Sequence, residues 1–222
     1  MAGDLDTDDL IARLALDARP VRRLAPPALR ATVWLLGALA AMAAIIAYHG
    51  LRPGLAEALA EPGGWLSILA AGATGVAATY AAFHLAIPGT SRGWALLPLP
   101  VALLWASGLG LGCYAEWLRQ GPAGLEFGEA FDCFLAIVLI SLLVGLPMLA
   151  MLRHGRLIRP VQTAAMGGLA VASLASAALE LFHEGDARIM DVIWHVAAVM
   201  LIVALSSGSG AAAGRSALRA ST

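Results

Sequence analysis

The only two cysteines of the chain, Cys113 and Cys133, are the side chains best suited to redox or metal chemistry. Each lies where a long apolar segment meets a polar connection, and residues 121–124 of that connection read Gly-Pro-Ala-Gly. Two thiols in this arrangement can form a disulfide in an oxidising compartment or bind a soft metal ion. There is no Cys-x-x-Cys pair, so the spacing is not a zinc signature. The alternative interpretation is two structural thiols that pack as small hydrophobes.

A second group of ionisable side chains follows the fifth apolar segment. Glu180, His183 and Glu184 share one face if that helix extends so far, and Asp191 and His195 lie one helical turn apart. Ionisable residues inside membrane helices are costly and commonly functional. With the two cysteines, His183, Asp191 and His195 are therefore candidate ligands for copper, zinc or cadmium. The alternative is that Asp191 caps the last helix and bonds His195 structurally. No cofactor is required by either interpretation.

These residues belong to a chain whose composition is typical of a membrane protein. Of its 222 residues 60% are hydrophobic and 13% charged, whereas soluble domains are about half apolar and a quarter charged. Six apolar segments approach the roughly 20 residues that span a bilayer. We predict an all-α membrane protein with six transmembrane helices, short loops and three helical hairpins. No phosphate loop or nucleophile elbow is present, so an enzyme is not expected. The segments are 32–48, 65–87, 94–114, 131–152, 161–182 and 189–205.

The distribution of arginine predicts the orientation. With the N-terminus inside, eleven of the 14 arginines lie on the inner side and only Arg52, Arg119 and Arg188 outside. The positive-inside rule then places both termini in the cytoplasm and both cysteines on the outer side. We expect residues 1–31 to form a cytoplasmic segment, 32–207 a six-helix transmembrane domain, and 208–222 a disordered cytoplasmic tail.

The segment before the first apolar run contains a short predicted helix. Thr7 is suited to be the helix N-cap and acidic residues follow it in the first turn. Pro20 ends the helix, and residues 21–27 form an extended connector. One face of the helix is apolar and needs a partner, which is either the membrane surface or a groove on another protein. That face consists of Leu10, Ile11 and Leu14.

Four stretches together resemble the NrsF family. They are residues 7–11, the connector 20–27, the connection between Cys113 and Cys133, and residues 181–195. The resemblance implies a six-helix protein of the bacterial inner membrane that negatively regulates an extracytoplasmic-function (ECF) sigma factor of the sigma-F type. It also implies that the N-terminal segment holds the sigma factor inactive, and that the cysteine pair takes part in its release under heavy-metal or oxidative stress. The expected partners are the sigma factor and the lipid bilayer, without direct binding of nucleic acid. Candidate sigma-binding residues are Leu10, Ile11, Leu14, Arg22 and Arg23.

Other functional classes stay open at the level of sequence. Acidic and histidine residues near one membrane face could serve a small-ion transporter, and a cysteine pair could serve a membrane thiol-redox protein. Against both, no charged residue lies at mid-membrane to form a path, and Cys-x-x-Cys is absent. A passive assembly factor is a third alternative.

Overall fold

A computed structural model describes residues 7–16, 24–60, 64–121, 130–153, 159–182 and 189–219, and every regular element in these ranges is a helix. The elements are α1 (Thr7–Leu16), α2 (Pro27–His49), α3 (Leu55–Ala60), α4 (Gly64–Leu85), η1 (Arg92–Leu96), α5 (Leu99–Gln120), α6 (Ala130–Arg153), α7 (Pro160–Phe182) and α8 (Ile189–Arg219). Six of these helices are long. The shorter ones are α1, α3 and the 3-10 helix η1.

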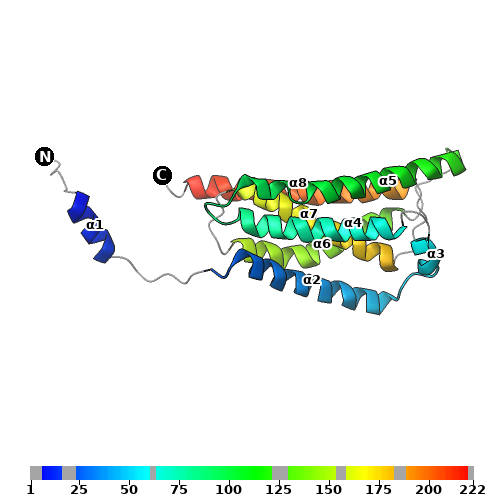
Figure 1. The fold of residues 1–222 in the computed structure, drawn as a ribbon, viewed down its shortest axis with the longest axis horizontal. Coiled ribbons are helices and arrows are strands. Elements are labelled where there is room, and N and C mark those ends of the chain that lie inside the picture. Colours follow the sequence, from blue (N-terminus) through cyan, green and yellow to red (C-terminus); the bar gives the residue numbers. More distant parts are fainter. Residues whose placement is uncertain are drawn as a thin grey trace.

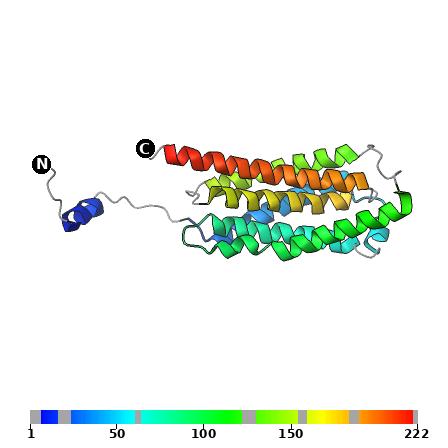
Figure 2. The same ribbon diagram turned by 90° about the horizontal axis from the view of Figure 1, so that it is seen from above.

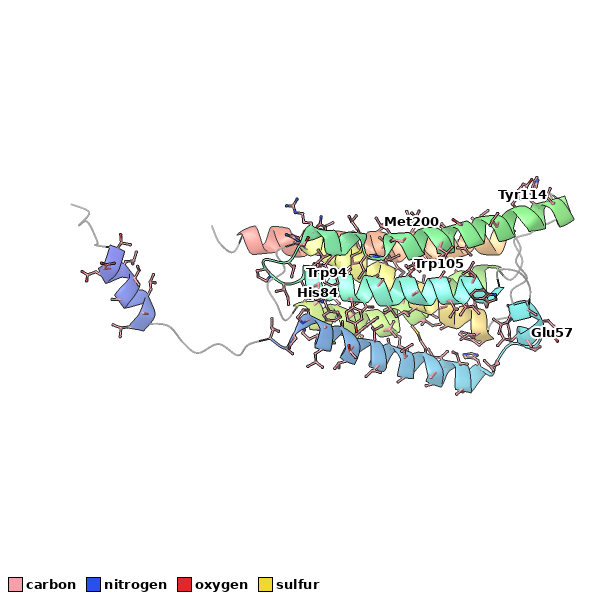
Figure 3. The ribbon with its side chains drawn as sticks, viewed as in Figure 1. Glu57, His84, Trp94, Trp105, Tyr114 and Met200 are labelled. Atoms are coloured by element: carbon pink, nitrogen blue, oxygen red, sulfur yellow. The ribbon has the colours of Figure 1, made fainter. Side chains whose placement is uncertain are left out.

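The six long helices lie side by side in one elongated bundle, and successive helices run in opposite directions (Figures 1 and 2). We call the end of the bundle at which α2 begins the arm end, because the N-terminal arm, the segment that contains α1, joins the bundle there. We call the opposite end the far end. Figure 3 places His84 and Trp94 at the arm end and Glu57 and Tyr114 at the far end. The predicted fold class is therefore confirmed as all-helical over the described residues.

Five stretches are long and apolar enough to cross a membrane. Each overlaps one of the first five predicted segments. The sixth predicted segment falls in α8, whose apolar stretch is the shorter Val196–Ser209, so a sixth span stays a prediction. The five spans are Pro27–His49, Gly64–Leu85, Arg92–Leu111, Phe134–Arg153 and Pro160–Phe182.

Helix α7 forms the centre of the bundle because its side chains are small. Between Thr163 and Leu179 nearly every residue is buried, and most are Ala, Gly or Ser. Lipid tails are as apolar as leucine, so membrane helices associate by close packing, which small residues allow. A Cβ on Gly75 of α4 would lie only 2.5 Å from Leu174 Cγ of α7, and one on Gly168 of α7 only 2.7 Å from Ser206 Oγ of α8. Helices α4 and α8 thus both press closely against α7.

The packing of neighbours differs from three sequential hairpins. Helices α2 and α4 pack together, as do α7 and α8, in agreement with two of the expected hairpins. Over the described residues, however, α5 packs mainly on α4, whereas α6 packs on α7 and α8. The two views show α5 and α6 on different sides of the bundle (Figures 1 and 2). The third and fourth apolar segments are therefore consecutive in sequence without forming a packed pair.

The C-terminal region also differs from the expectation of a disordered tail over 208–222. Helix α8 continues to Arg219, and residues 220–222 lie outside the described ranges. Alanine is the best helix former, and it occupies residues 211–213 of this stretch. The hydroxyls of Ser207 and Ser209 donate to the carbonyls of Val203 and Ser206 within the helix. The helix therefore extends through a region whose Gly and Ser content predicted disorder.

Candidate functional site

The two cysteines lie on helices that end and begin at the far end. Cys113 is in the last two turns of α5, and Cys133 is in the first turn of α6. Tyr114, which follows Cys113, lies at the far end in Figure 3. The predicted placement of both residues next to one connection therefore agrees with the backbone, while their side chains lie outside the part of the chain that the structure describes. Because α5 and α6 have different packing partners, a bond or shared metal ion between the cysteines would link two sides of the bundle.

Two of the remaining metal-ligand candidates, Asp191 and His195, lie on a helix that begins at the same end. Asp191 and His195 are one turn apart near the start of α8, as their spacing predicted. Their side chains and all of His183 lie outside the described residues. Among the side chains that the structure describes, no group of three or more His, Cys, Asp or Glu could hold a metal ion. A metal site built from these residues stays a prediction.

The N-terminal helix forms where the sequence predicted it. Helix α1 begins at Thr7, and Asp8 and Asp9 lie in its first turn. The apolar face stays open to solvent, with exposed fractions of 44% for Leu10, 58% for Ile11 and 64% for Leu14. An apolar helix face of this kind is a ready binding surface, because burial of each leucine or isoleucine yields about 1.5–3 kcal/mol. Of the other sigma-binding candidates, Arg22 and Arg23 lie outside the described residues.

A polar cluster at the far end contains a carboxylate whose partners were not predicted. The Ser67 hydroxyl of α4 donates to Glu180 Oε1 of α7 at 3.0 Å. The Arg52 backbone N–H donates to Leu181 O at 3.0 Å, which brings the positive charge of Arg52 near Glu180. The His49 ring stacks on Phe182 with centroids 5.2 Å apart. The sequence marks Glu180 as an ionisable residue in a membrane helix, but it contains no signal for a serine 113 residues away.

A second cluster, at the arm end, joins α2 to α6. Arg30 is 8% exposed; its guanidinium donates to Met151 O and lies 5.2 Å from the centre of the Phe83 ring. The indole N–H of Trp34 donates to Val144 O at 3.1 Å. In the sequence, Arg30 was recognisable only as one of the eleven arginines expected on the inner side. The available signal was that Arg30 is a charged residue four positions after Pro26, on the helix face that also carries Trp34.

The α4–α5 connection is fixed at the same end. The Thr90 hydroxyl donates to the carbonyls of His84 and Ile87, and Arg159 Nη1 donates to Thr90 O at 3.1 Å. The His84 ring stacks on Trp94 with centroids 3.8 Å apart and planes 9° apart. His84 is thus a packing residue of this turn. The inner-side arginines Arg30 and Arg159 both bind backbone carbonyls at the arm end.

Five helices of membrane length and apolar composition are typical of a helical membrane protein. Residues 14–219 match the family model NrsF, described as negative regulator of sigma F. The chain belongs to this family, whose members are regulators, in agreement with the expectation that it is not an enzyme.

One curated relative matches part of the chain. The "Anti-sigma-F factor NrsF" of Caulobacter vibrioides (strain NA1000 / CB15N) is 39% identical over 90 residues. The match covers 40% of this chain and 42% of the relative's length. No solved structure matches the chain.

Proposed function

We propose that this protein is a membrane anti-sigma factor that sequesters an ECF sigma factor of the sigma-F type. In this proposal the protein is located in the bacterial inner membrane, and both of its termini lie in the cytoplasm. Membership of the family supports the class of partner. The observation that carries the proposal is the exposed apolar face of α1, formed by Leu10, Ile11 and Leu14.

The charges of α1 favour a protein groove over the membrane surface as the partner of this face. Helices that lie on a membrane surface carry Lys and Arg on their polar face, because the inner leaflet is anionic. Helix α1 instead begins with exposed Asp8 and Asp9, against a single arginine, Arg13. A carboxylate pair disfavours an anionic surface and suits a basic surface beside an apolar groove.

The arginines at the arm end support its assignment to the cytoplasm. Arg92 and Arg153 are exposed there, and Arg30 and Arg159 bind carbonyls there. An excess of arginine marks the cytoplasmic side of a membrane protein. The segment that contains α1 enters the bundle at this end and so shares the compartment of a sigma factor.

Binding is tested by capture of purified sigma F on the full chain in detergent. We expect the variant Leu10→Asp/Leu14→Asp to lose capture, because two carboxylates replace apolar side chains in the groove. The matched control is Leu16→Asp, on the same helix but outside the apolar face. Failure of the full chain to capture sigma F would refute the proposed function, and equal capture by the double variant would refute the role of α1.

We propose further that stress is sensed at Cys113 and Cys133. Oxidation would join the two thiols in a disulfide, with two electrons and two protons passing to an oxidant such as diamide. Thiolates also bind copper, zinc or cadmium, and His183, Asp191 and His195 would supply additional ligands. Either event would pull together helices that pack on different neighbours.

Sensing is tested by release of sigma F from the purified complex on addition of Cd²⁺ or diamide. We expect Cys113→Ser/Cys133→Ser to capture sigma F like the parent chain and to retain it after either addition. His154→Ala, which removes a histidine that is not among these proposed ligands, is the control and should release normally. Full release from the double variant would refute the cysteine sensor while leaving sigma binding intact.

A further inference from the structure

Two residues on one face of α2 bind α6 through side-chain donors. Arg30 and Trp34 are four positions apart, which places them one above the other on a helix. Both are buried, although α2 lies at the edge of the bundle and exposes many of its leucines to the surroundings. Their donors go to Met151 O and Val144 O of α6. The start of α2 is thus held to α6 by two specific side-chain bonds, in addition to the packing of its Ala31 and Leu35 in the core.

The carbonyls that accept these bonds lie at, or next to, carbonyls of α6 that have no donor within the helix. Met151 is in the last turn of α6, where carbonyls lack an intrahelical donor and a positive charge is favourable. Val144 is three residues before Pro147, which lies inside the helix and has no N–H. The carbonyl that Pro147 leaves without its helical donor is that of Leu143, which is next to Val144, and a proline inside a helix is a common point of bending. Neighbouring side chains stabilise such points in membrane helices.

The same segment of α6 is connected to the far end by one continuous helix. Cys133 and Pro147 are both within α6 and are separated by 14 residues, or about 21 Å along the helix axis. On the other side of the contact, Arg30 is only four residues from Pro26, at which the connector to α1 joins α2. Helix α6 therefore reaches from the cysteine end to the first turn of the helix that carries the N-terminal segment.

We propose that Arg30 and Trp34 are positioning residues that lock the first two turns of α2 onto the Pro147 segment of α6. A displacement of α6 caused at Cys133 then moves the start of α2, and with it the segment that holds the sigma factor. This inference rests on the proposed function. The lock itself is a structural statement that can be tested without a sigma factor.

The structural test measures the distance between spin labels on α2 and α6 in the full chain. Labels are attached at Val33→Cys and Leu146→Cys, both on exposed positions, after Cys113 and Cys133 are replaced with serine. We expect a narrow distance distribution that broadens in Arg30→Met/Trp34→Phe, because both donors are lost. An unchanged distribution in that variant would overturn the lock.

Matched variants distinguish the effect of breaking the lock from the effect of losing any arginine or any tryptophan. Arg92→Met and Trp65→Phe change an exposed arginine and an exposed tryptophan elsewhere, and both should keep the narrow distribution. Arg30→Lys keeps a positive donor near the end of α6. Its distance distribution should therefore be narrower than that of Arg30→Met. Equal broadening by Arg30→Lys and Arg30→Met would overturn a specific bond from Arg30.

The functional test uses the chain with its native cysteines and Cd²⁺ as the probe. We expect Arg30→Met/Trp34→Phe to capture sigma F and to require about fivefold or more Cd²⁺ for half-release, the smallest change that a typical coupling between sites gives. Broadened spin-label distances with an unchanged Cd²⁺ midpoint would overturn the coupling. If the parent chain captures no sigma F, the proposed function fails, and the spin-label distances alone decide whether the lock exists.

Discussion

Replacing Gly75 with alanine tests how closely α4 approaches α7. The new Cβ would lie 2.5 Å from Leu174 Cγ, 2.9 Å from Leu174 Cδ2 and 3.2 Å from Ala170 O. Carbon atoms in contact are normally about 3.5–4.0 Å apart, so the helices must separate by about 1 Å. Leu174 is itself buried in the core of the bundle. Overpacking of this kind costs about 1–3 kcal/mol.

The same helix offers the control. A Cβ on Gly72 meets nothing within 4 Å, so Gly72→Ala retains only the gain in helix propensity, about 1 kcal/mol. We expect the free energy of unfolding of Gly75→Ala to be about 1–3 kcal/mol below that of Gly72→Ala. The measurement is unfolding in detergent micelles, followed by helical circular dichroism during titration with sodium dodecyl sulfate.

A double-mutant cycle identifies Leu174 as the cause. Leu174→Ala removes the two closest atoms and on its own costs about 2–5 kcal/mol. In that background Gly75→Ala should destabilise much less, because only the 3.2 Å contact with Ala170 O remains, and the coupling energy should be about 1–3 kcal/mol. The reasoning is refuted if Gly75→Ala and Gly72→Ala agree within about 0.5 kcal/mol, or if the cost of Gly75→Ala persists in the Leu174→Ala background.

Two further predictions concern side-chain contacts at the two ends of the bundle. Both are tested by the same unfolding titration. Ser67→Ala removes the hydroxyl that binds Glu180 and should cost about 1–3 kcal/mol, whereas Ser107→Ala, whose exposed hydroxyl bonds only within its own helix, should change stability by less than about 0.5 kcal/mol. His84→Ala should cost about 1 kcal/mol more than His84→Phe, because phenylalanine keeps a ring stacked on Trp94. Equal effects within either pair would contradict the assigned contact.

The sequence was sufficient to predict the long helices of the bundle because each is encoded locally. The predicted segment 65–87 and the observed α4 differ by one or two residues at each end, since a run of about 20 apolar residues records the bilayer thickness directly. Helix α1 was predicted from Thr7 and the two acids that follow. Helix α3 was not predicted, because its six residues are too few to show a periodic pattern.

The neighbours of each helix could not be predicted in the same way. In lipid the outward and inward faces of a helix are both apolar, so hydrophobic periodicity does not mark the packed side. The peripheral α2 and the central α7 are both mainly apolar and rich in alanine, and they differ chiefly in the additional Gly and Ser residues of α7. The bond from Arg30 to Met151 joins residues 121 positions apart, a pairing that no local pattern encodes. The side chains of the cysteine site are not described, so its geometry stays a prediction.

The central position of α7 has a consequence for biogenesis. A chain is synthesised from its N-terminus, so α2, α4, α5 and α6 enter the bilayer before the helix on which α4 and α6 pack has been made. Each is stable there as a separate helix, because the backbone hydrogen bonds of a membrane helix are made within the helix itself. The contact of α2 with α6 needs neither later helix and can form during this interval. A ribosome that stalls before Pro160 would therefore leave an inserted but unassembled protein, and maturation depends on the last third of the chain.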